Sequence, residues 1–271
     1  NDLGSIYLDG IYVKQDVNKA IQYFLISAKS NNYRAFYNLG VLYYEGKYVQ
    51  QNIYKAIHYL SLSANSYYSH ALYLLGKIYF DNKFIACDIN KAIEYLSKAA
   101  FQNNKYAQYL LGIIFSDGKL IQRNINKAIY YFSLSADNYN SDAAFQLGCL
   151  YHQGLYIEKD IEKAIRLYKN SSSFNNCYAK NNLGVIYKSN MQIKNISFAK
   201  EYFIESIKQK DFILSMFNLV NIYLDEGEIE KSINLLIKLS IKEFIPSQMM
   251  LCYLLTKNQN DINLKTISGE I

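Results

Sequence analysis

Between Tyr33 and Tyr67, apolar residues fall into two stripes, each spaced by four positions. The first stripe is Ala35, Leu39 and Tyr43, and the second is Ala56, Leu60 and Ala64. A spacing of i, i+4 and i+8 places side chains on one face of an α-helix. The segment therefore predicts two helices that pack their apolar faces together, joined by a polar loop.

The same pattern recurs along the chain with a step of 36 residues. Its Leu-Gly pair stands at Leu3-Gly4, Leu39-Gly40, Leu75-Gly76, Leu111-Gly112, Leu147-Gly148 and Leu183-Gly184. An aromatic residue follows four positions after each of these Leu residues and after Leu219, at Tyr7, Tyr43, Tyr79, Phe115, Tyr151, Tyr187 and Tyr223. A fixed period of this size is the signature of a solenoid. We therefore expect an all-α fold of antiparallel helix pairs, arranged as a single array over residues 1–271.

The array is expected to contain about seven motif-bearing units, with a partial repeat at each end and irregular spacing after residue 190. Asn1 is not a Met, and Leu3 already lies midway through a repeat. Near the other end, Asp261-Ile262-Asn263 repeats the pattern of Asp88-Ile89-Asn90. We therefore expect the chain to be part of a longer protein.

Turn and capping residues recur with the same step. Gly46 is expected to end the first helix in the left-handed conformation, and its equivalents are Gly10, Asn82, Gly118, Gly154 and Asn190. Asn52 is expected to cap the second helix, and its equivalents are Asp16, Asp88, Asn124 and Asp160. Gly40 follows Leu39 on a face that a neighbouring helix must approach closely. The small side chains of Ala56 and Ala64 favour the same close packing.

The unit reads A-x-x-x-L-G-x-x-Y-x-x-G, then D/N-x-x-K-A and a final Ala, and it resembles the Sel-1-like repeat. The resemblance covers essentially the whole chain and is carried, in the second unit, by Ala35, Leu39-Gly40, Tyr43, Gly46, Asn52, Lys55-Ala56 and Ala64. It implies a right-handed superhelix of helix pairs. It also implies an adaptor role, since such proteins act in membrane-protein quality control, cell-wall synthase activation, signalling and host–pathogen contact.

By analogy with tetratricopeptide arrays, the first helix of each repeat is expected to line a concave face. The residue two before each Leu would point into the groove, at Tyr37, Tyr73, Tyr109 and Phe145, with Arg34, His70 and Tyr106 beside it. A row of rigid aromatic side chains suits a peptide or another extended segment. The alternative is that these rings pack between adjacent first helices.

A column of lysines opens each second helix, at Lys19, Lys55, Lys91, Lys127 and Lys163. Ten residues before the first four stand Asp9, Glu45, Asp81 and Asp117. A cation in the first turn opposes the helix dipole. We therefore expect each lysine to pair with the carboxylate of its own repeat, as Lys55 with Glu45.

The sequence offers little sign of a metal site, a disulfide framework or a membrane-spanning segment. The formal charge of +6 is spread along the chain, and the cysteines at 87, 149, 177 and 252 occupy different phases of the repeat, which predicts four unpaired, mostly buried thiols. His58, His70 and His152 are separated by phase, so no metal site or other cofactor is expected. No apolar run is long enough to span a bilayer.

The motifs at Asn170 and Asn195 fit N-glycosylation sequons but are expected as chance matches in an Asn-rich chain. Asn195 also falls near a helix start, where modification would interfere. The compartment stays open between the cytoplasm and the lumen of the endoplasmic reticulum.

These observations favour a non-enzymatic adaptor that binds a protein segment in a concave groove, as in quality control of the endoplasmic-reticulum-associated degradation type. One alternative is an RNA-binding helical-repeat protein, which the carboxylates of Glu45, Asp81 and Asp117 disfavour. Another alternative is a regulatory repeat region of a larger enzyme complex.

Overall fold

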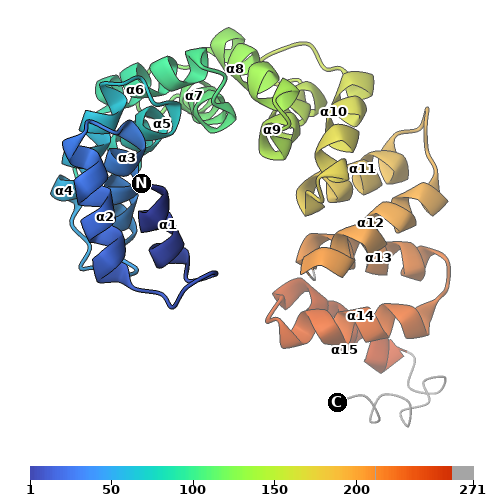
Figure 1. Ribbon diagram of the computed structural model, residues 1–271. Helices are drawn as coiled ribbons and strands as arrows, with labels where there is room; N and C mark the ends of the chain where they lie inside the picture. The colour runs from blue at the N-terminus through green and yellow to red at the C-terminus, as the bar shows by residue number, and fades with distance from the viewer. Residues whose placement is uncertain (211, 258–271) are drawn as a thin grey trace. The chain divides into compact units, whose positions relative to one another are not determined.

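The computed structural model describes residues 1–210 and 212–257, and over these ranges the chain forms α-helices and turns without a strand (Figure 1). The helices are α1 Asp2–Asp9, α2 Val17–Lys29, α3 Tyr33–Glu45, α4 Ile53–Ala64, α5 Ser69–Phe80, α6 Ile89–Phe101, α7 Lys105–Asp117, α8 Ile125–Asp137, α9 Ser141–Gln153, α10 Ile161–Ser173, α11 Cys177–Ser189, α12 Ile196–Lys210, α13 Ile213–Asp225, α14 Ile229–Ile241 and α15 Ile245–Lys257. The predicted all-α solenoid of helix pairs is confirmed.

The helices form two compact units, one over Asn1–Ala143 and one from Ala144 onward. Within each unit, consecutive helices pack as pairs, such as α3 with α4 and α11 with α12. The single array over residues 1–271 stays a prediction. The predicted motif at Asp261-Ile262-Asn263 lies outside the described residues.

The Leu-Gly pair creates the contact between the two helices of a repeat. A Cβ atom added to Gly40 would lie 2.7 Å from Cγ of Leu60, the central residue of the second stripe. Ala35, Leu39 and Ala56 around this contact are fully buried. The same contact recurs between Gly4 and Phe24, Gly76 and Leu96, Gly112 and Phe132, Gly148 and Tyr168, and Gly184 and Phe203. The glycine is thus required by the neighbouring side chain, as predicted.

The predicted caps of the second helices are confirmed. The Oδ1 atom of Asn52 accepts a hydrogen bond from the backbone N–H of Lys55 at 3.0 Å. The side chains of Asp16, Asp88, Asn124 and Asp160 accept the equivalent bond. Each cap satisfies one of the amide groups that a helix start leaves without a partner.

The predicted left-handed residues at the ends of the first helices are confirmed with one exception. Gly46 has φ of 67° and Asn82 has φ of 48°. Asn190 instead has φ of −78° and ψ of 113°, so the prediction for this residue is wrong. The capping residue of the next helix, Asn195, follows after five positions instead of the six that separate Gly46 from Asn52. In this shorter loop the Asn190 side chain accepts from the N–H of Gln192 at 3.0 Å.

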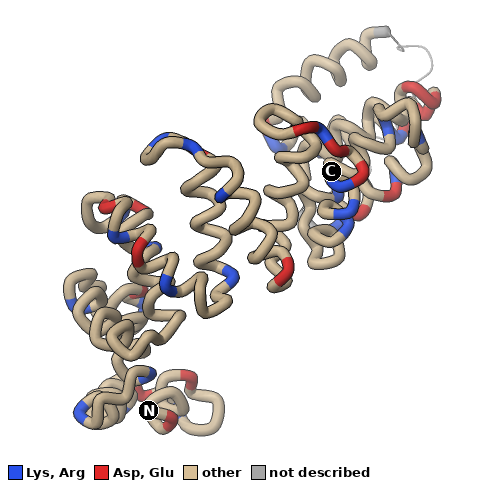
Figure 2. Tube along the Cα trace, turned by 90° about the horizontal axis from the view of Figure 1, so that it is seen from above, with Lys and Arg blue, Asp and Glu red and all other residues tan. Residues whose placement is uncertain are grey.

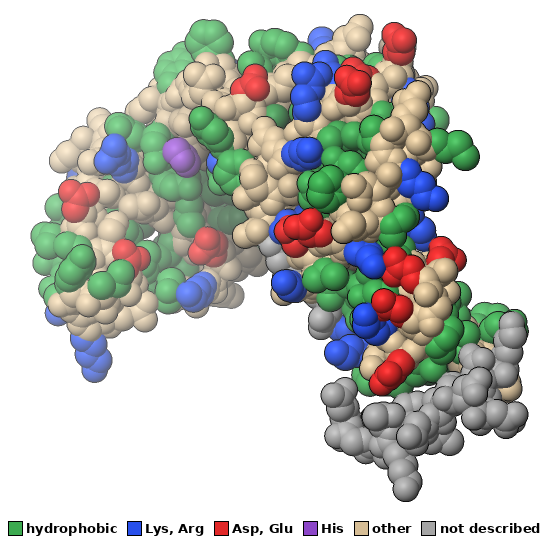
Figure 3. Space-filling model, turned by 90° about the vertical axis from the view of Figure 1, so that its right-hand side faces the viewer, with side chains coloured by type: hydrophobic (Ala, Val, Ile, Leu, Met, Phe, Trp, Pro, Cys, Tyr) green, Lys and Arg blue, Asp and Glu red, His purple; other side chains and the backbone are tan. Residues whose placement is uncertain are grey.

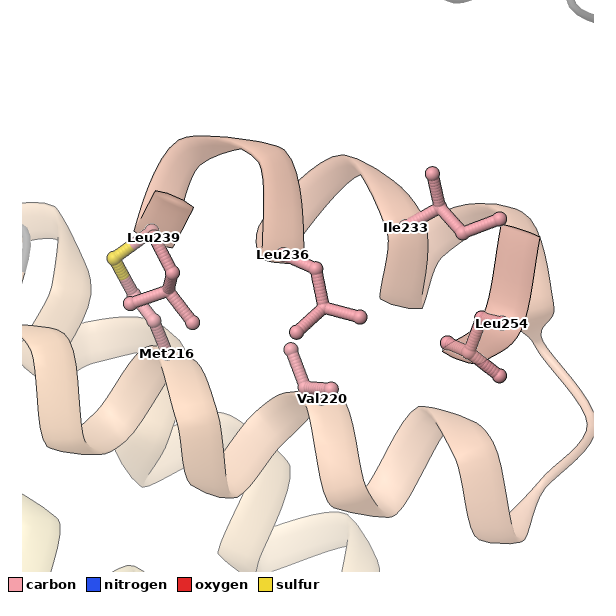
Figure 4. Packing of buried hydrophobic residues seen from close by; sticks show 6 residues of the cluster. All are labelled: Met216, Val220, Ile233, Leu236, Leu239 and Leu254. Carbon is pink, nitrogen blue, oxygen red and sulfur yellow. The ribbon is translucent and has the colours of Figure 1, made fainter. Parts of the chain in front are cut away.

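The second unit ends in a core without the glycine contact. Met216 and Val220 of α13 point toward Leu239 and Leu236 of α14 (Figure 4). Gly227, with φ of 77°, makes the short turn between these two helices. Helix α14 therefore begins early, at Ile229, and the only proline of the sequence, Pro246, lies in the first turn of α15.

Candidate functional site

The predicted row of first-helix aromatics lies at the surface of the first unit, where each ring contacts an aromatic side chain of another element. Tyr37, Tyr73 and Tyr109 are half-buried on α3, α5 and α7. The ring of Tyr37 lies 6.1 Å from that of His70, and the ring of Tyr73 lies 5.7 Å from that of Tyr106. Tyr37 and Tyr73 thus contact the second predicted column on the next first helix, whereas the Tyr109 ring contacts Phe132 of α8. The rings pack against neighbouring helices and also remain partly exposed, and binding by the row stays a prediction.

One residue at the centre of this surface was missed by the sequence reasoning. Tyr68 directly precedes α5, and its ring centre lies 5.1 Å from Tyr33, 5.2 Å from Tyr37 and 5.1 Å from His70. We call the whole surface the tyrosine strip, defined by Tyr33, Arg34, Tyr37, Tyr68, His70, Tyr73, Tyr106 and Tyr109. Its outer residues Arg34, His70 and Tyr106 are exposed, with 51% of the Tyr106 surface accessible.

Tyr68 occupies a position that other repeats give to a capping asparagine. Asn104 accepts from the N–H of Ala107 at 3.1 Å, and its amide group donates to the carbonyl of Ser69 at 3.4 Å. Asn32, Asn140 and Asn176 cap their helices in the same way. Tyr68 makes no side-chain cap bond, and loss of such a cap typically costs about 0.5–2 kcal/mol. The sequence could have indicated Tyr68, because a Tyr stands there at a position where Asn recurs with the 36-residue step.

The preceding residue breaks a second local preference. Tyr67 has φ of 55°, in the left-handed region, where the equivalent residues Asn31, Asn103, Tyr139 and Asn175 also lie. Asn tolerates this region far better than an aromatic residue does. Tyr67 is 68% exposed, so burial does not compensate. The turn between α8 and α9 has the same exception at Tyr139, so it is the combination of Tyr67 with the uncapped Tyr68 that distinguishes the turn between α4 and α5.

The hydroxyl groups of Tyr37 and Tyr73 in the tyrosine strip are uncharged. Burial raises the pKa of Tyr37, and Tyr68 and Glu45 raise it further. Burial likewise raises the pKa of Tyr73, with Asp81 as the next cause. Both hydroxyl groups stay protonated at physiological pH, so they can donate hydrogen bonds while their rings offer apolar surface.

Phe145, the fourth predicted row residue, belongs to the second unit. Its ring lies 5.9 Å from Tyr178 and 5.9 Å from Tyr168. At the next position of the row, Asn181 is buried, and its Oδ1 accepts hydrogen bonds from Ser215 at 3.0 Å and Asn218 at 3.1 Å. A buried polar network replaces the aromatic row residue there, while ring contacts continue from Tyr178 to Phe212, with 4.8 Å between ring centres.

The lysine column has a different partner from the predicted one. The Nζ atom of Lys55 lies over the ring of Tyr43, 5.1 Å from its centre. Corresponding contacts join Lys19 to Tyr7, Lys91 to Tyr79, Lys127 to Phe115, Lys163 to Tyr151 and Lys231 to Tyr223. Lysines of this column form ion pairs with residues at the start of their own helix, Lys19 with Asp16 at 3.7 Å, Lys91 with Asp88 at 3.3 Å and Lys231 with Glu228 at 2.6 Å.

The predicted pairing of Lys55 with Glu45, and of its equivalents, is therefore wrong. The ammonium group instead lies over the aromatic residue four positions after the recurring Leu, as Lys55 lies over Tyr43. The ring of Tyr43 also stacks on Tyr59 of the second helix, and this contact was not predicted from the sequence. A tyrosine follows four of the five lysines by four positions, at Tyr23, Tyr59, Tyr95 and Tyr131, and Leu167 stands there after Lys163.

A second polar cluster lies in the core of the second unit. The fully buried Tyr168 takes the place of Leu60, and its hydroxyl lies 3.4 Å from Cys149 Sγ and 3.4 Å from His152 Nδ1. The amide group of Asn182 donates to the same hydroxyl at 3.1 Å. Burial raises the pKa of the Cys149 thiol and lowers the pKa of His152. Both groups are therefore held neutral.

The four cysteines are free, at positions 87, 149, 177 and 252. Cys177 is buried and Cys252 is exposed, so the prediction that the thiols are mostly buried is wrong. Within residues 1–210 and 212–257, no three His, Cys, Asp or Glu side chains gather as a metal site would require. No helix in the same ranges is long and apolar enough to cross a membrane.

The two sequons lie on helices or at a helix end. Asn195 precedes α12, and its Oδ1 accepts from the N–H of Phe198 at 3.0 Å, which confirms its predicted place at a helix start. Asn170 is exposed on α10. Whether either sequon is glycosylated stays a prediction.

Comparison with known proteins identifies the repeat. The Sel1 repeat model matches residues 1–32, 34–68, 69–104, 105–140, 141–173 and 177–211. A Sel1 repeat protein from Oxalobacter formigenes is 26% identical with a TM-score of 0.69, over 77% of this chain and 86% of that chain. A protective antigen of uropathogenic Escherichia coli with an SLR fold is 25% identical with a TM-score of 0.50, over 94% of this chain and 63% of that chain. No curated protein sequence matches the chain.

Six matched repeats cover most of the chain, and their boundaries fall at the turns that join one helix pair to the next. The structural neighbours repeat the same helix pair. The chain belongs to the Sel1 repeat family.

Proposed function

We propose that this protein is a non-enzymatic adaptor that holds an extended segment of a partner protein against the tyrosine strip. The observation that carries the proposal is the continuous ring contact from Tyr33 through Tyr68 to His70 on a surface that stays partly exposed. Repeat proteins of this kind commonly bind other macromolecules along an extended surface.

The chemistry of the strip suits a protein segment. Tyrosine combines a large apolar ring with a hydroxyl donor and loses little conformational entropy on binding, since it has two side-chain torsions. The rings of Tyr37 and Tyr73 are already held by their neighbours. A partner would therefore meet a surface that is largely ordered before binding, which lowers the entropic cost of association.

The protonation states of the second unit support a role without catalysis. A nucleophilic cysteine needs a lowered pKa, usually beside a protonated histidine. Cys149 and His152 show the opposite shifts, because burial favours the neutral thiol and the neutral imidazole. Their contact with Tyr168 is a satisfied buried hydrogen-bond cluster.

The distribution of charge favours a protein over RNA as the partner. Lys and Arg are interspersed with Asp and Glu along the trace (Figure 2), and the face in Figure 3 carries both signs without a single basic patch. Continuous binding to a phosphate backbone needs a basic track. A place in membrane-protein quality control of the endoplasmic-reticulum-associated degradation type rests on the family resemblance alone.

The test is cross-linked affinity capture with mass spectrometry, using the tagged chain and two triple variants. The strip variant replaces Tyr37, Tyr73 and Tyr109 by Leu, which keeps most of the packing volume of these half-buried rings. The matched control replaces Tyr12, Tyr54 and Tyr130 by Leu, since these tyrosines are exposed on a loop and on second helices. Circular dichroism checks that all three proteins are equally helical.

Proteins captured by the wild type and the control, and lost by the strip variant, would support the proposal. Equal capture by all three proteins would overturn it, because the strip would then be a packing feature only.

A further inference from the structure

A pocket opens between α1 and α3, at the junction of the first two repeats, and its volume is about 170 Å³. Its floor is apolar, since Phe24 is fully buried and Leu42 is almost so. Leu8 and Val41 form half-buried walls. An engineered apolar cavity of about 150 Å³ binds benzene. The pocket is therefore large enough for one aromatic ring.

The pocket arises from a departure in one column of the repeat. Leu8 stands where the next two repeats have Tyr44 and Phe80. At the following junction, the ring of Tyr44 meets the loop residue Phe84 edge to face, with 5.9 Å between ring centres. The equivalent of Phe84 at the first junction is Tyr48, which lines the pocket together with Leu8. The first junction thus keeps the loop ring and lacks the ring that would meet it.

Tyr48 forms a wall that is ordered before any partner binds. The Nζ atom of Lys47 lies over the Tyr48 ring, 4.8 Å from its centre. Hydrogen bonds to Lys47 and Gln15 lower the pKa of the Tyr48 hydroxyl. A ring that is already held in place loses little conformational entropy when a second ring packs against it.

The charges at the mouth of the pocket do not select its occupant. Asp9, Glu45 and Lys47 are exposed there and carry both signs. Water on an apolar floor has few hydrogen-bond partners, and an apolar group that displaces such water gains affinity. The shape and the apolar floor therefore favour an uncharged ring.

We propose that this pocket takes a Phe or Tyr side chain of the partner segment that the tyrosine strip holds. The inference rests on the proposed function and adds a residue that the partner must carry. Val41 follows Tyr37 by four positions on α3, so the two side chains lie on one face of the helix. The pocket is therefore continuous with the strip. The bound ring would meet Tyr48 as Tyr44 meets Phe84, in the geometry that aromatic pairs prefer.

The experiment is panning of a phage-displayed library of random peptides on the whole chain, followed by affinity measurements with synthetic peptides. The variant Leu8→Tyr adds the ring that Tyr44 supplies at the next junction, and it should fill the pocket. The matched control Leu155→Tyr adds the same ring to an exposed loop. We expect enriched peptides with Phe or Tyr at one fixed position. Their affinity should fall about tenfold or more for Leu8→Tyr and stay unchanged for the control.

A change in the peptide isolates the contribution of the pocket. When the fixed aromatic residue of the peptide is replaced by Ala, the peptide should bind the wild type and Leu8→Tyr equally, because neither protein then has a ring to receive.

A second measurement uses the wild type alone and so does not depend on the folding of a variant. Titration with p-cresol should shift the methyl resonances of Leu8, Val41 and Leu42 in a saturable way, through the ring current of the bound probe. Isoamyl alcohol, which has no ring, should bind more weakly at the same methyl groups.

The possible results separate the pocket from the strip. Peptides that bind Leu8→Tyr as tightly as the wild type would overturn the inference, as would methyl groups that do not respond to p-cresol. If those peptides are still lost by the variant with Tyr37, Tyr73 and Tyr109 replaced by Leu, the proposed function stands without the pocket. Peptides lost by Leu8→Tyr and bound equally by the strip variant would support the aromatic pocket and remove the strip.

Discussion

The ammonium group of Lys55 lies 5.1 Å from the centre of the Tyr43 ring, and that ring stacks on Tyr59 with 5.9 Å between ring centres and 7° between planes. The three groups come from both helices of one repeat. Near-parallel ring pairs recur at Tyr7 with Tyr23, Tyr79 with Tyr95, Phe115 with Tyr131 and Tyr187 with Tyr202. The lysine column is therefore part of the packing of the repeat.

Replacing Lys55 by Met should have a small effect on stability. An exposed cation–π contact contributes about 0.5–1 kcal/mol, and the Met side chain keeps part of the contact with the ring. We expect the unfolding free energy from urea titration to fall by less than about 1 kcal/mol. Lys14→Met, in an exposed loop, is the control. A loss above about 2 kcal/mol would show that Lys55 holds the repeat through a stronger interaction.

Replacing Gly40 by Ala should destabilise the first unit, although Ala is the better helix former. The added methyl group would lie 2.7 Å from Cγ and 2.8 Å from Cδ2 of Leu60, and such overpacking costs about 1–3 kcal/mol. A double-mutant cycle checks the cause. In a Leu60→Ala background the added methyl group should cost less, or even stabilise, because the clash is gone. Equal costs in both backgrounds would assign the effect to something other than Leu60.

Replacing Tyr68 by Asn should stabilise the protein. The new side chain can cap α5, as Asn104 caps α7, and a cap of this kind contributes about 0.5–2 kcal/mol. The reciprocal variant Asn104→Ala should lose a similar amount, because it removes the bonds to Ala107 and Ser69. Thermal unfolding of both variants measures the difference. If Tyr68→Asn is less stable than the wild type, ring packing outweighs the missing cap.

Stability should decrease on mild acidification because of His152. Burial lowers the pKa of this imidazole, with Lys159 as a second cause, whereas an unfolded His titrates near about 6.5. Below that value the unfolded chain binds a proton that the folded protein resists. The contribution of His152 is therefore complete above about pH 6.5 and is lost as the pH falls toward the lower folded pKa.

The variant His152→Gln tests this pH dependence. Its urea midpoint should change less than that of the wild type between neutral pH and about pH 5. Parallel curves for the two proteins would show that His152 does not contribute to the acid sensitivity.

Much of the fold could be predicted because the repeat makes each structural role visible several times. Gly40, Gly46 and Asn52 each stand in columns whose members share one physical requirement, so a single unit predicted the others. The failure at Asn190 has the opposite cause. One deleted loop residue changes the backbone path there, and residue identity alone does not show how a shortened loop closes.

The candidate site was only partly predictable. Periodicity located Tyr37 and Tyr73, but it gave Tyr68 no role, because Tyr68, like Phe212, replaces the capping asparagine that other repeats have at this position. The partner of Lys55 was missed for another reason. Opposite charge suggested Glu45, whereas the geometry of the helix pair brings the ammonium group over Tyr43.

The most direct test of the account compares the wild type with the variant Tyr68→Asn. The affinity of each protein for a partner identified by affinity capture is measured together with its melting temperature. The account predicts that binding weakens about tenfold or more, since hot-spot aromatic residues contribute this much, while the melting temperature stays the same or rises. Unchanged affinity in a protein of equal or greater stability would contradict the account, because the centre of the strip would then play no part in binding.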